Sequence, residues 1–271
     1  MRLPFEDEMR RTAAAWDEVT PIHRAHRLDE AAFFAAGGCG LDPVERERLG
    51  SIAGLTVAHL CCNCGQDTLS LANLGARCTG FDFSSAAIAE ARRLSLASGV
   101  PAEFALANVL DLPDAFNARF DLVYLSRGVL VWLPDLGLLT QSAAALLRPG
   151  GRLFLYDQHP FAHLLAEDIG QGLRVGYDYF EQGPAECRGL DYIGGTTYDA
   201  LPNYQFMVRL GDLLSGIAAA GLRLTELREY DHAMFRQFPG MVEAEPGHFR
   251  FPEGLGLPRV PLMLLLEAVK D

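Results

Sequence analysis

The chain lacks the features that mark nucleic-acid-binding, secreted and membrane-spanning proteins. Its 271 residues carry a formal net charge of −12 and no block of lysine or arginine, so a nucleic-acid backbone would be repelled. The best candidate for a membrane span, Val260 to Val269, is far too short to cross a bilayer. The N-terminus is charged and has no apolar signal-peptide stretch. We therefore expect a cytoplasmic protein whose partners include neither nucleic acid nor a membrane.

The sequence also lacks a cysteine pattern suited to disulfides or to a closed metal site. Six cysteines occur, and Cys61, Cys62 and Cys64 form a C-C-x-C run. A structural zinc site would need a second pair of ligands at a comparable spacing, and no second C-x-x-C follows. We therefore predict no metal site and interpret these cysteines as small buried apolar residues.

What is present is an alternation of strand-like and helix-like segments with short connections. Such alternation predicts an α/β fold with a mainly parallel sheet, helices on both faces and right-handed crossovers. The expected strands are 56–62, 77–83, 102–108, 120–127, 152–159, 222–231 and 260–270. The expected helices are 67–75, 85–99 and 208–221, and the stretch 133–151 is expected to be a helix followed by a turn at residues 149–151.

The length suits one large domain or one domain with an insertion. Residues 1–50 predict one or two helices that form an N-terminal cap, and residues 51–271 form the core. The alternation of strand-like and helix-like segments breaks at residues 161–206, which we interpret as an insertion or lid over the sheet edge. Residues 232–258, rich in Phe, Pro and Gly, are expected to form a loop over the active site.

The first turn, within "TVAHLCCNCG" at residues 56–65, is poor in glycine for a ligand-binding turn. Ligands of open parallel sheets bind at the carboxyl ends of strands, where the backbone must bend sharply and glycine serves best. Of the several glycines usual in such a turn, only Gly65 is present here. Asn63 tolerates a left-handed backbone, and Cys61 and Cys64 are small. The turn therefore still predicts a ligand site.

Asp82 ends the next predicted strand, 17 residues after Gly65. A carboxylate at this position can accept hydrogen bonds from the ribose hydroxyls of an adenosyl group. It could instead cap the following helix, but Ser84 is the better N-cap. We therefore favour the ribose role for Asp82.

Five motifs in order make the chain resemble the class I S-adenosylmethionine-dependent methyltransferases of the small-molecule type, over roughly residues 50–160. The motifs are "HLCCNCG", "GFDFS", "ALANVLDLP", "FDLVYLSRGVLVWLPD" and "LLRPGGRLFLYDQHP". His59 stands where the family has an acid, and Cys61, Asn63 and Gly65 stand at its three glycines. A subset of the family replaces the glycine-rich form by "HLxCxxGxDTLSLAxLGA", which this chain matches.

The resemblance implies a Rossmann-like sheet of seven strands, mostly parallel with the last strand antiparallel, and S-adenosyl-L-methionine as cofactor. It implies that Asp82 binds the ribose and that Asn108 accepts a hydrogen bond from the adenine amine. The positions implied to contact the cofactor are Cys61, Asn63, Gly65, Thr68, Asp82, Phe83, Asn108, Val109 and Ser126.

Two other functions remain open. A nicotinamide-dependent oxidoreductase also ends its second strand in an acid, but it needs early glycines to approach a pyrophosphate. This turn lacks them, and S-adenosylmethionine has no phosphate. The altered glycines also leave room for an accessory or repurposed protein that binds the cofactor without transferring methyl.

The expected reaction is methyl transfer to oxygen, nitrogen or carbon of a small molecule, in which the enzyme aligns the acceptor and excludes water. Asp157 and His159 face the same side at the end of a strand and are candidate catalytic groups, although His159 could equally be structural. Arg127 could bind a substrate carboxylate or pair with an acidic neighbour, and the insertion's aromatic residues form a substrate lid or ordinary loop packing. The predicted substrate contacts are Arg127, Tyr179, Tyr192, Tyr204, His232 and Arg236. A homodimer is the expected assembly.

Overall fold

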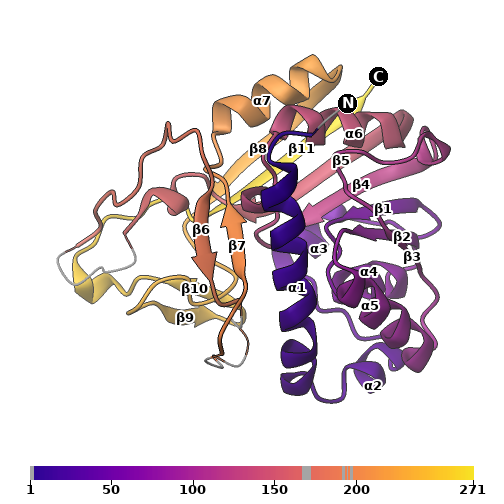
Figure 1. Ribbon diagram of the computed structural model, residues 1–271, viewed down its shortest axis with the longest axis horizontal. Helices are drawn as coiled ribbons and strands as arrows, with labels where there is room; N and C mark the ends of the chain where they lie inside the picture. Colours follow the sequence, from indigo (N-terminus) through magenta and orange to yellow (C-terminus); the bar gives the residue numbers. More distant parts are fainter. Residues whose placement is uncertain (1–2, 167–171, 191–192, 194, 196–197) are drawn as a thin grey trace.

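The computed structural model describes residues 3–166, 172–190, 193, 195 and 198–271. Its centre is a seven-stranded sheet (Figure 1). The strands, in spatial order, are β3 (Glu103–Leu106), β2 (Arg77–Asp82), β1 (Thr56–Leu60), β4 (Phe120–Ser126), β5 (Leu147–Gln158), β11 (Met263–Lys270) and β8 (Leu222–Tyr230). Pairs from β3 to β5 are parallel, and β11 runs antiparallel to both β5 and β8. The predicted Rossmann-like mixed sheet is confirmed.

Alternation along the strands divides the core into two faces, because successive side chains of a strand point to opposite sides. In β4, Val123 and Leu125 join the cluster that packs against α6 and α7. Leu122 and Tyr124 join the opposite cluster, which includes residues of α3 and α4. Both faces are covered by helices, which explains why β4 is apolar almost throughout.

Seven α-helices surround the sheet within the described residues. They are α1 (Glu6–His26), α2 (Glu30–Ala35), α3 (Pro43–Leu49), α4 (Gln66–Asn73), α5 (Ser85–Ser98), α6 (Leu136–Leu146) and α7 (Leu210–Ala219). The Ser84 side chain accepts a hydrogen bond from the backbone N–H of Ala87, so its predicted N-cap role is confirmed. Helix α1 packs against α5 and against β7 (Pro202–Gln205), which places it across the carboxyl ends of the sheet (Figure 1).

Two hairpins lie outside the central sheet, on the side of α1 away from β1, β2 and β3 (Figure 1). One pairs β6 (Ala185–Arg188) with β7, and the other pairs β9 (Val242–Glu245) with β10 (His248–Arg250). Four short 3-10 turns complete the described structure, η1 (Asp114–Phe116), η2 (Leu130–Trp132), η3 (Ala162–Leu164) and η4 (Glu253–Leu255).

The observed elements correct three local predictions. The N-terminal segment holds three helices rather than one or two. Helix α6 ends at Leu146, and the predicted turn at residues 149–151 lies inside β5, where the pairing with β4 shifts register. The segment 232–258 contains the β9–β10 hairpin, whose turn at Pro246-Gly247 has Gly247 at φ +80°, a conformation that glycine adopts without strain.

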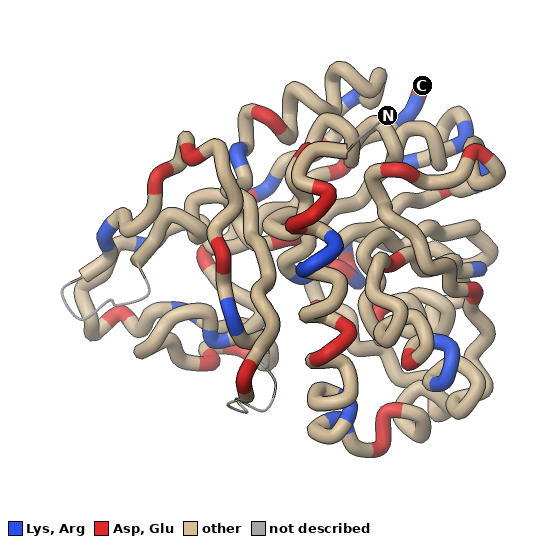
Figure 2. The backbone as a smooth tube through the Cα atoms, viewed as in Figure 1, with Lys and Arg blue, Asp and Glu red and all other residues tan. Residues whose placement is uncertain are grey.

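The charge pattern of the tube view agrees with the composition. Acidic and basic residues are interspersed over the described chain (Figure 2), and acidic residues are in excess in the sequence. Among the described helices, none is both long enough and apolar enough to cross a bilayer.

Candidate functional site

A cavity of about 470 Å³ lies at the carboxyl ends of β1, β2 and β4. Its walls include the first turn, the ends of these strands, helix α1 and residues from the segments 161–206 and 232–258. This is the edge at which open α/β sheets bind their ligands. The predicted residues that line it are Cys61, Asn63, Asp82, Phe83, Asn108, Val109, Ser126 and Arg127.

The first turn has a left-handed backbone at each of the three positions that resemble the family's glycines. Cys61 has φ +56°, Asn63 has φ +47° and Gly65 has φ +81°. Such angles are uncommon outside glycine, and Asn is among the residues that tolerate them best. A Cβ atom on Gly65 would lie 2.8 Å from the ring of Phe104, so this glycine is required by space as well as by conformation.

Asp82 holds this turn against the end of β2. Its Oδ2 accepts a hydrogen bond from the Asn63 backbone N–H at 2.8 Å, and its Oδ1 accepts one from the Ser84 N–H at 2.9 Å. Burial raises the pKa of this carboxyl to about 6, and the backbone donors only partly offset that effect. Each oxygen keeps a further lone pair, so the carboxylate can also accept from a diol in the cavity.

The wall beside Asp82 is apolar and partly aromatic. Trp16 of α1 meets Trp132 edge to face, with ring centroids 5.4 Å apart, and both rings line the cavity. Met9 of α1 lies beside Asn108, whose Oδ1 accepts a hydrogen bond from the Leu110 N–H at 3.0 Å. This arrangement suits a flat heteroaromatic ring that carries hydrogen-bonding groups on its edge.

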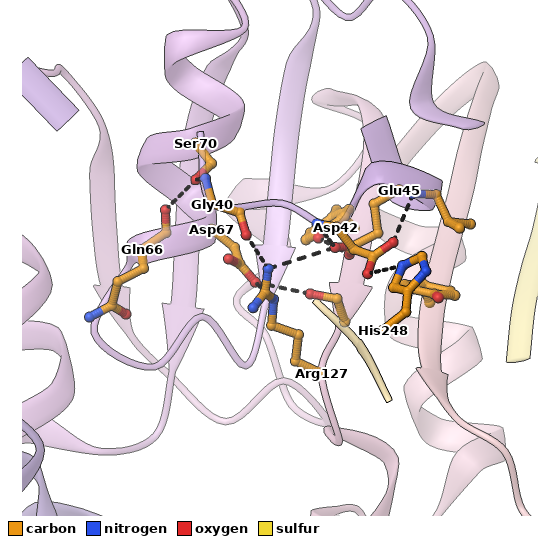
Figure 3. Close-up of polar contacts among 12 residues, drawn as sticks. Gly40, Asp42, Glu45, Gln66, Asp67, Ser70, Arg127 and His248 are labelled. Atoms are coloured by element: carbon orange, nitrogen blue, oxygen red, sulfur yellow. Dashed lines mark hydrogen bonds and ion pairs between the residues drawn. The ribbon is translucent and has the colours of Figure 1, made fainter. Parts of the chain in front are cut away.

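A charged cluster lies at the end of β4, opposite Asp82. The Nε of Arg127 lies 2.7 Å from Oδ2 of Asp67, and its Nη2 donates to the carbonyl of Gly40 and lies 3.8 Å from Oε2 of Glu45 (Figure 3). Burial raises the pKa of Glu45 to about 8. Of the two roles predicted for Arg127, the geometry favours pairing with acidic neighbours.

His59 and Thr68 form a buried pair under this cluster. Nδ1 of His59 lies 2.8 Å from Oγ1 of Thr68, and burial lowers the pKa of the imidazole to about 4. His59 lines the cavity, whereas Thr68 is fully buried behind it. A neutral ring therefore occupies the position at which the resemblance implied an acid.

The two residues predicted to be catalytic lie outside the cavity wall. The Asp157 carboxylate is buried and accepts hydrogen bonds from the backbone N–H groups of Gly128, Leu130 and Gln158. It therefore holds the loop after β4. His159 lies 2.8 Å through Nε2 from Glu229 and accepts from the Phe161 N–H through Nδ1. The prediction that both face the same side rested on strand alternation, which does not reach His159 because β5 ends at Gln158.

His163 was not foreseen, and it lines the cavity from the turn η3. Burial and the neighbouring His159 lower the pKa of its imidazole to about 4. The ring has no hydrogen-bond or ion-pair partner among the described residues. The sequence held one signal for it, since His159 and His163 form an H-x-x-x-H pair directly after a predicted strand.

Of the remaining predicted substrate contacts, none that the structure describes lines the cavity. The Tyr179 hydroxyl accepts from the Leu210 N–H, Tyr204 packs on α1 and bonds Glu186, and His232 stacks on His248. Arg236 is exposed, and Tyr192 lies outside the described residues. Gln158, Gln205, Met234, Phe235 and Met263 line that end of the cavity instead.

The described residues contain no group of three or more His, Cys, Asp or Glu side chains that could hold a metal ion. Cys61, Cys62 and Cys64 are free thiols. Burial raises the pKa of Cys61 and Cys62 far above the usual thiol range, so both stay protonated at neutral pH.

Comparison with proteins of known family supports one interpretation of the cavity. A family described as a methyltransferase domain matches residues 57–151. A ubiquinone biosynthesis O-methyltransferase of Methylobacterium sp. (strain 4-46) is 33% identical over 147 residues, or 52% of this chain and 57% of the relative. Another, of Xanthomonas euvesicatoria pv. vesicatoria (strain 85-10), is 28% identical over 192 residues, or 69% of this chain and 72% of the relative. The match thus spans little more than half of the first relative.

Solved structures share the fold. An S-adenosylmethionine-dependent methyltransferase from Mesorhizobium loti superposes with a TM-score of 0.58 at 22% identity, covering 84% of this chain and 96% of that one. Geranyl diphosphate C-methyltransferase from Streptomyces coelicolor A3(2), solved with Mg²⁺, geranyl diphosphate and S-adenosyl-L-homocysteine, gives 0.54 at 13% identity, covering 83% and 76%.

The matched domain contains the turn with its three left-handed residues and Asp82 at the end of β2. The matches favour a methyl donor over a nicotinamide cofactor, as the missing early glycines predicted. Residues 57–151 therefore match a methyltransferase domain, and the comparisons support S-adenosyl-L-methionine as the cofactor of this cavity.

Proposed function

We propose that this chain transfers the methyl group of S-adenosylmethionine to a hydroxyl oxygen of a small, largely apolar acceptor, with His163 as the base. The observation that carries the proposal is an unpartnered, neutral imidazole in the same cavity as the carboxylate of Asp82. The relatives from Methylobacterium and Xanthomonas are O-methyltransferases of ubiquinone biosynthesis, which supports oxygen over nitrogen or carbon.

The residues around the cavity fit the two partners at different ends. Asp82, Asn63 and the Trp16–Trp132 pair supply the diol acceptor, the bent backbone and the flat wall that an adenosyl group requires. Met234, Phe235 and Met263 line the other end with apolar surface, where an acceptor ring can be buried. The segments 161–206 and 232–258 supply part of that wall, which supports their proposed role as covers of the acceptor.

The sulfonium methyl is activated by its own charge, so the protein's contribution is alignment, exclusion of water and removal of a proton. His163 accepts the hydroxyl proton while the acceptor oxygen takes the methyl group in line with the breaking carbon–sulfur bond. Its low pKa keeps the lone pair available at neutral pH. Asp157 is a positioning residue, because it fixes the loop from Gly128 to Leu130 that lines the cavity.

His163→Gln tests the base, and His159→Gln is its matched control. We expect turnover in His163→Gln to fall about 100-fold, the range that a general base contributes, while affinity for S-adenosylhomocysteine stays unchanged. His159 lies outside the cavity, pairs with a half-exposed Glu229 and acts on His163 only as a neighbour that lowers its pKa. Its variant should therefore lose much less turnover than His163→Gln. Wild-type turnover in His163→Gln, or an equal loss in both variants, would remove His163 from the mechanism.

An acceptor panel separates the enzyme from a protein that only binds the cofactor. The panel contains dihydroxybenzenes, heteroaromatic amines and carbon acids, each incubated with methyl-labelled S-adenosylmethionine, with the methylated atom identified by NMR. Methyl on oxygen supports the proposal, and methyl on nitrogen or carbon contradicts it. S-adenosylhomocysteine should raise the melting temperature and NAD should not.

Four further expectations stay predictions. They are the N-terminal cap at residues 1–50, the core at residues 51–271, a cytoplasmic location and a homodimer.

A further inference from the structure

The amino-acid end of S-adenosylmethionine carries a positive ammonium group that must find an opposite charge in the cavity. A buried charge without such a partner is costly. Among the described residues that line the cavity, Asp67 and Asp82 are the acidic ones. His59 is neutral or positive but never negative, so it cannot balance the ammonium in either protonation state.

Asp82 is committed elsewhere. Both of its oxygens accept backbone hydrogen bonds that hold the first turn, and its remaining lone pairs are assigned to the ribose hydroxyls in the proposed function. The side chain of Asp67 is different. Its Oδ2 accepts from the Ser126 hydroxyl at 3.2 Å and lies 2.7 Å from Nε of Arg127, but its Oδ1 has no partner among the described residues.

Asp67 is also held rigidly in place. It lies in the first turn of α4, one residue before Thr68, and its side chain is 12% exposed. Arg127, the residue that fixes it, is itself anchored by the Gly40 carbonyl and by Glu45 (Figure 3). Gly40 is bound in turn, since its N–H donates to Oγ of Ser70 at 2.9 Å. The free oxygen of Asp67 is therefore pre-positioned at the cavity wall beside the end of β4.

We propose that Asp67 binds the ammonium group of the cofactor's amino-acid end, and that Arg127 is the positioning residue that orients its carboxylate. The inference rests on the proposed function, because it names how the same cavity holds the same cofactor. It accounts for the missing acid at residue 59, since the negative charge is supplied from α4 instead of from the end of β1.

The test is a binding cycle with two ligands that share the adenosyl group. S-adenosylhomocysteine carries the amino-acid end, and 5′-methylthioadenosine lacks it. We expect Asp67→Asn to weaken S-adenosylhomocysteine about 30-fold, the loss of one charge-assisted hydrogen bond, and to change 5′-methylthioadenosine by less than about twofold. Asp82→Asn should weaken both ligands, and Arg127→Lys should reproduce the ligand-selective loss of Asp67→Asn in smaller measure. Isothermal titration calorimetry measures each affinity.

A ligand-side measurement protects the test against a variant that fails to fold. Wild-type protein should bind the deaminated analogue of S-adenosylhomocysteine about 30-fold more weakly than the parent, and this difference should vanish in Asp67→Asn. Equal weakening of both adenosyl ligands by Asp67→Asn, or a wild type indifferent to the amine, would overturn the inference alone. A wild type that binds neither adenosyl ligand would instead overturn the proposed function.

Discussion

At one end of the cavity much of the wall comes from one stretch of chain, Cys61 to Asp82, which holds the first turn, helix α4 and strand β2. At the other end His163, Gln205 and Met234 come from segments far apart in sequence. The first end offers a bent backbone and the carboxylates of Asp67 and Asp82. The second presents apolar side chains and an unpartnered ring. A cofactor common to a family can be held by a local motif, whereas an acceptor is selected by contacts that only the folded chain assembles.

The largest expected effect is on the cofactor end. Asp82→Asn removes the charge that accepts from a diol, and we expect affinity for S-adenosylhomocysteine to fall about 100-fold, since hydrogen bonds to charged groups are the stronger ones. Calorimetry measures the loss. Asp17→Asn is the control, because Asp17 caps α5 through Ser84 and Ala86 without lining the cavity. Equal losses in the two variants would mean that Asp82 acts through the fold alone.

The pH dependence of binding sharpens the same contrast. Asp82 has a pKa raised by burial to about 6 from 3.8, with Asp17 nearby adding to the shift. Affinity for S-adenosylhomocysteine should be constant above pH 6 and fall up to about tenfold per unit below it, because protonation replaces an acceptor with a donor. The folding stability of the apo protein should depend on pH with the opposite sign. The contribution of Asp82 to folding is fully present below pH 3.8 and is lost as the pH rises through about 6.

Asp157 titrates near the same pH, so the profile needs a control. In Asp82→Asn the step near pH 6 should disappear. A step that persists in this variant would assign the pH dependence to Asp157 and to the loop that it holds.

The smallest expected effect is on the acceptor end. Phe235→Ala should raise the KM for the acceptor about tenfold, the value of burying an aromatic ring, and should leave affinity for S-adenosylhomocysteine unchanged. Phe180→Ala is the matched control, because Phe180 is 70% exposed and does not line the cavity. If Phe235→Ala weakens the cofactor instead, the two ends are not independent and the comparison fails.

Sequence reasoning succeeded where local spacing decides geometry. Asn63 and Gly65 take the left-handed backbone expected of them, whereas the left-handed Cys61 was not predicted. Asp82 lies at the cavity because it ends the adjacent parallel strand. It failed for His159, because two-residue alternation holds only inside a strand and β5 ends one residue earlier. His163, four residues on, faces the cavity from a 3-10 turn, which no periodicity indicated.

The sequence by itself determined the alternating fold, the parallel sheet, the cofactor class and the small-residue turn, since each depends on neighbours close in the chain. Only the tertiary structure decided which histidine reaches the cavity and which acid keeps a free oxygen. Asp67 and Arg127 are 60 residues apart in number yet lie 2.7 Å apart in space, because α4 and the end of β4 meet at one edge of the sheet. Contacts of that kind arise from the packing of elements that are distant in the sequence, so no local sequence pattern predicts them.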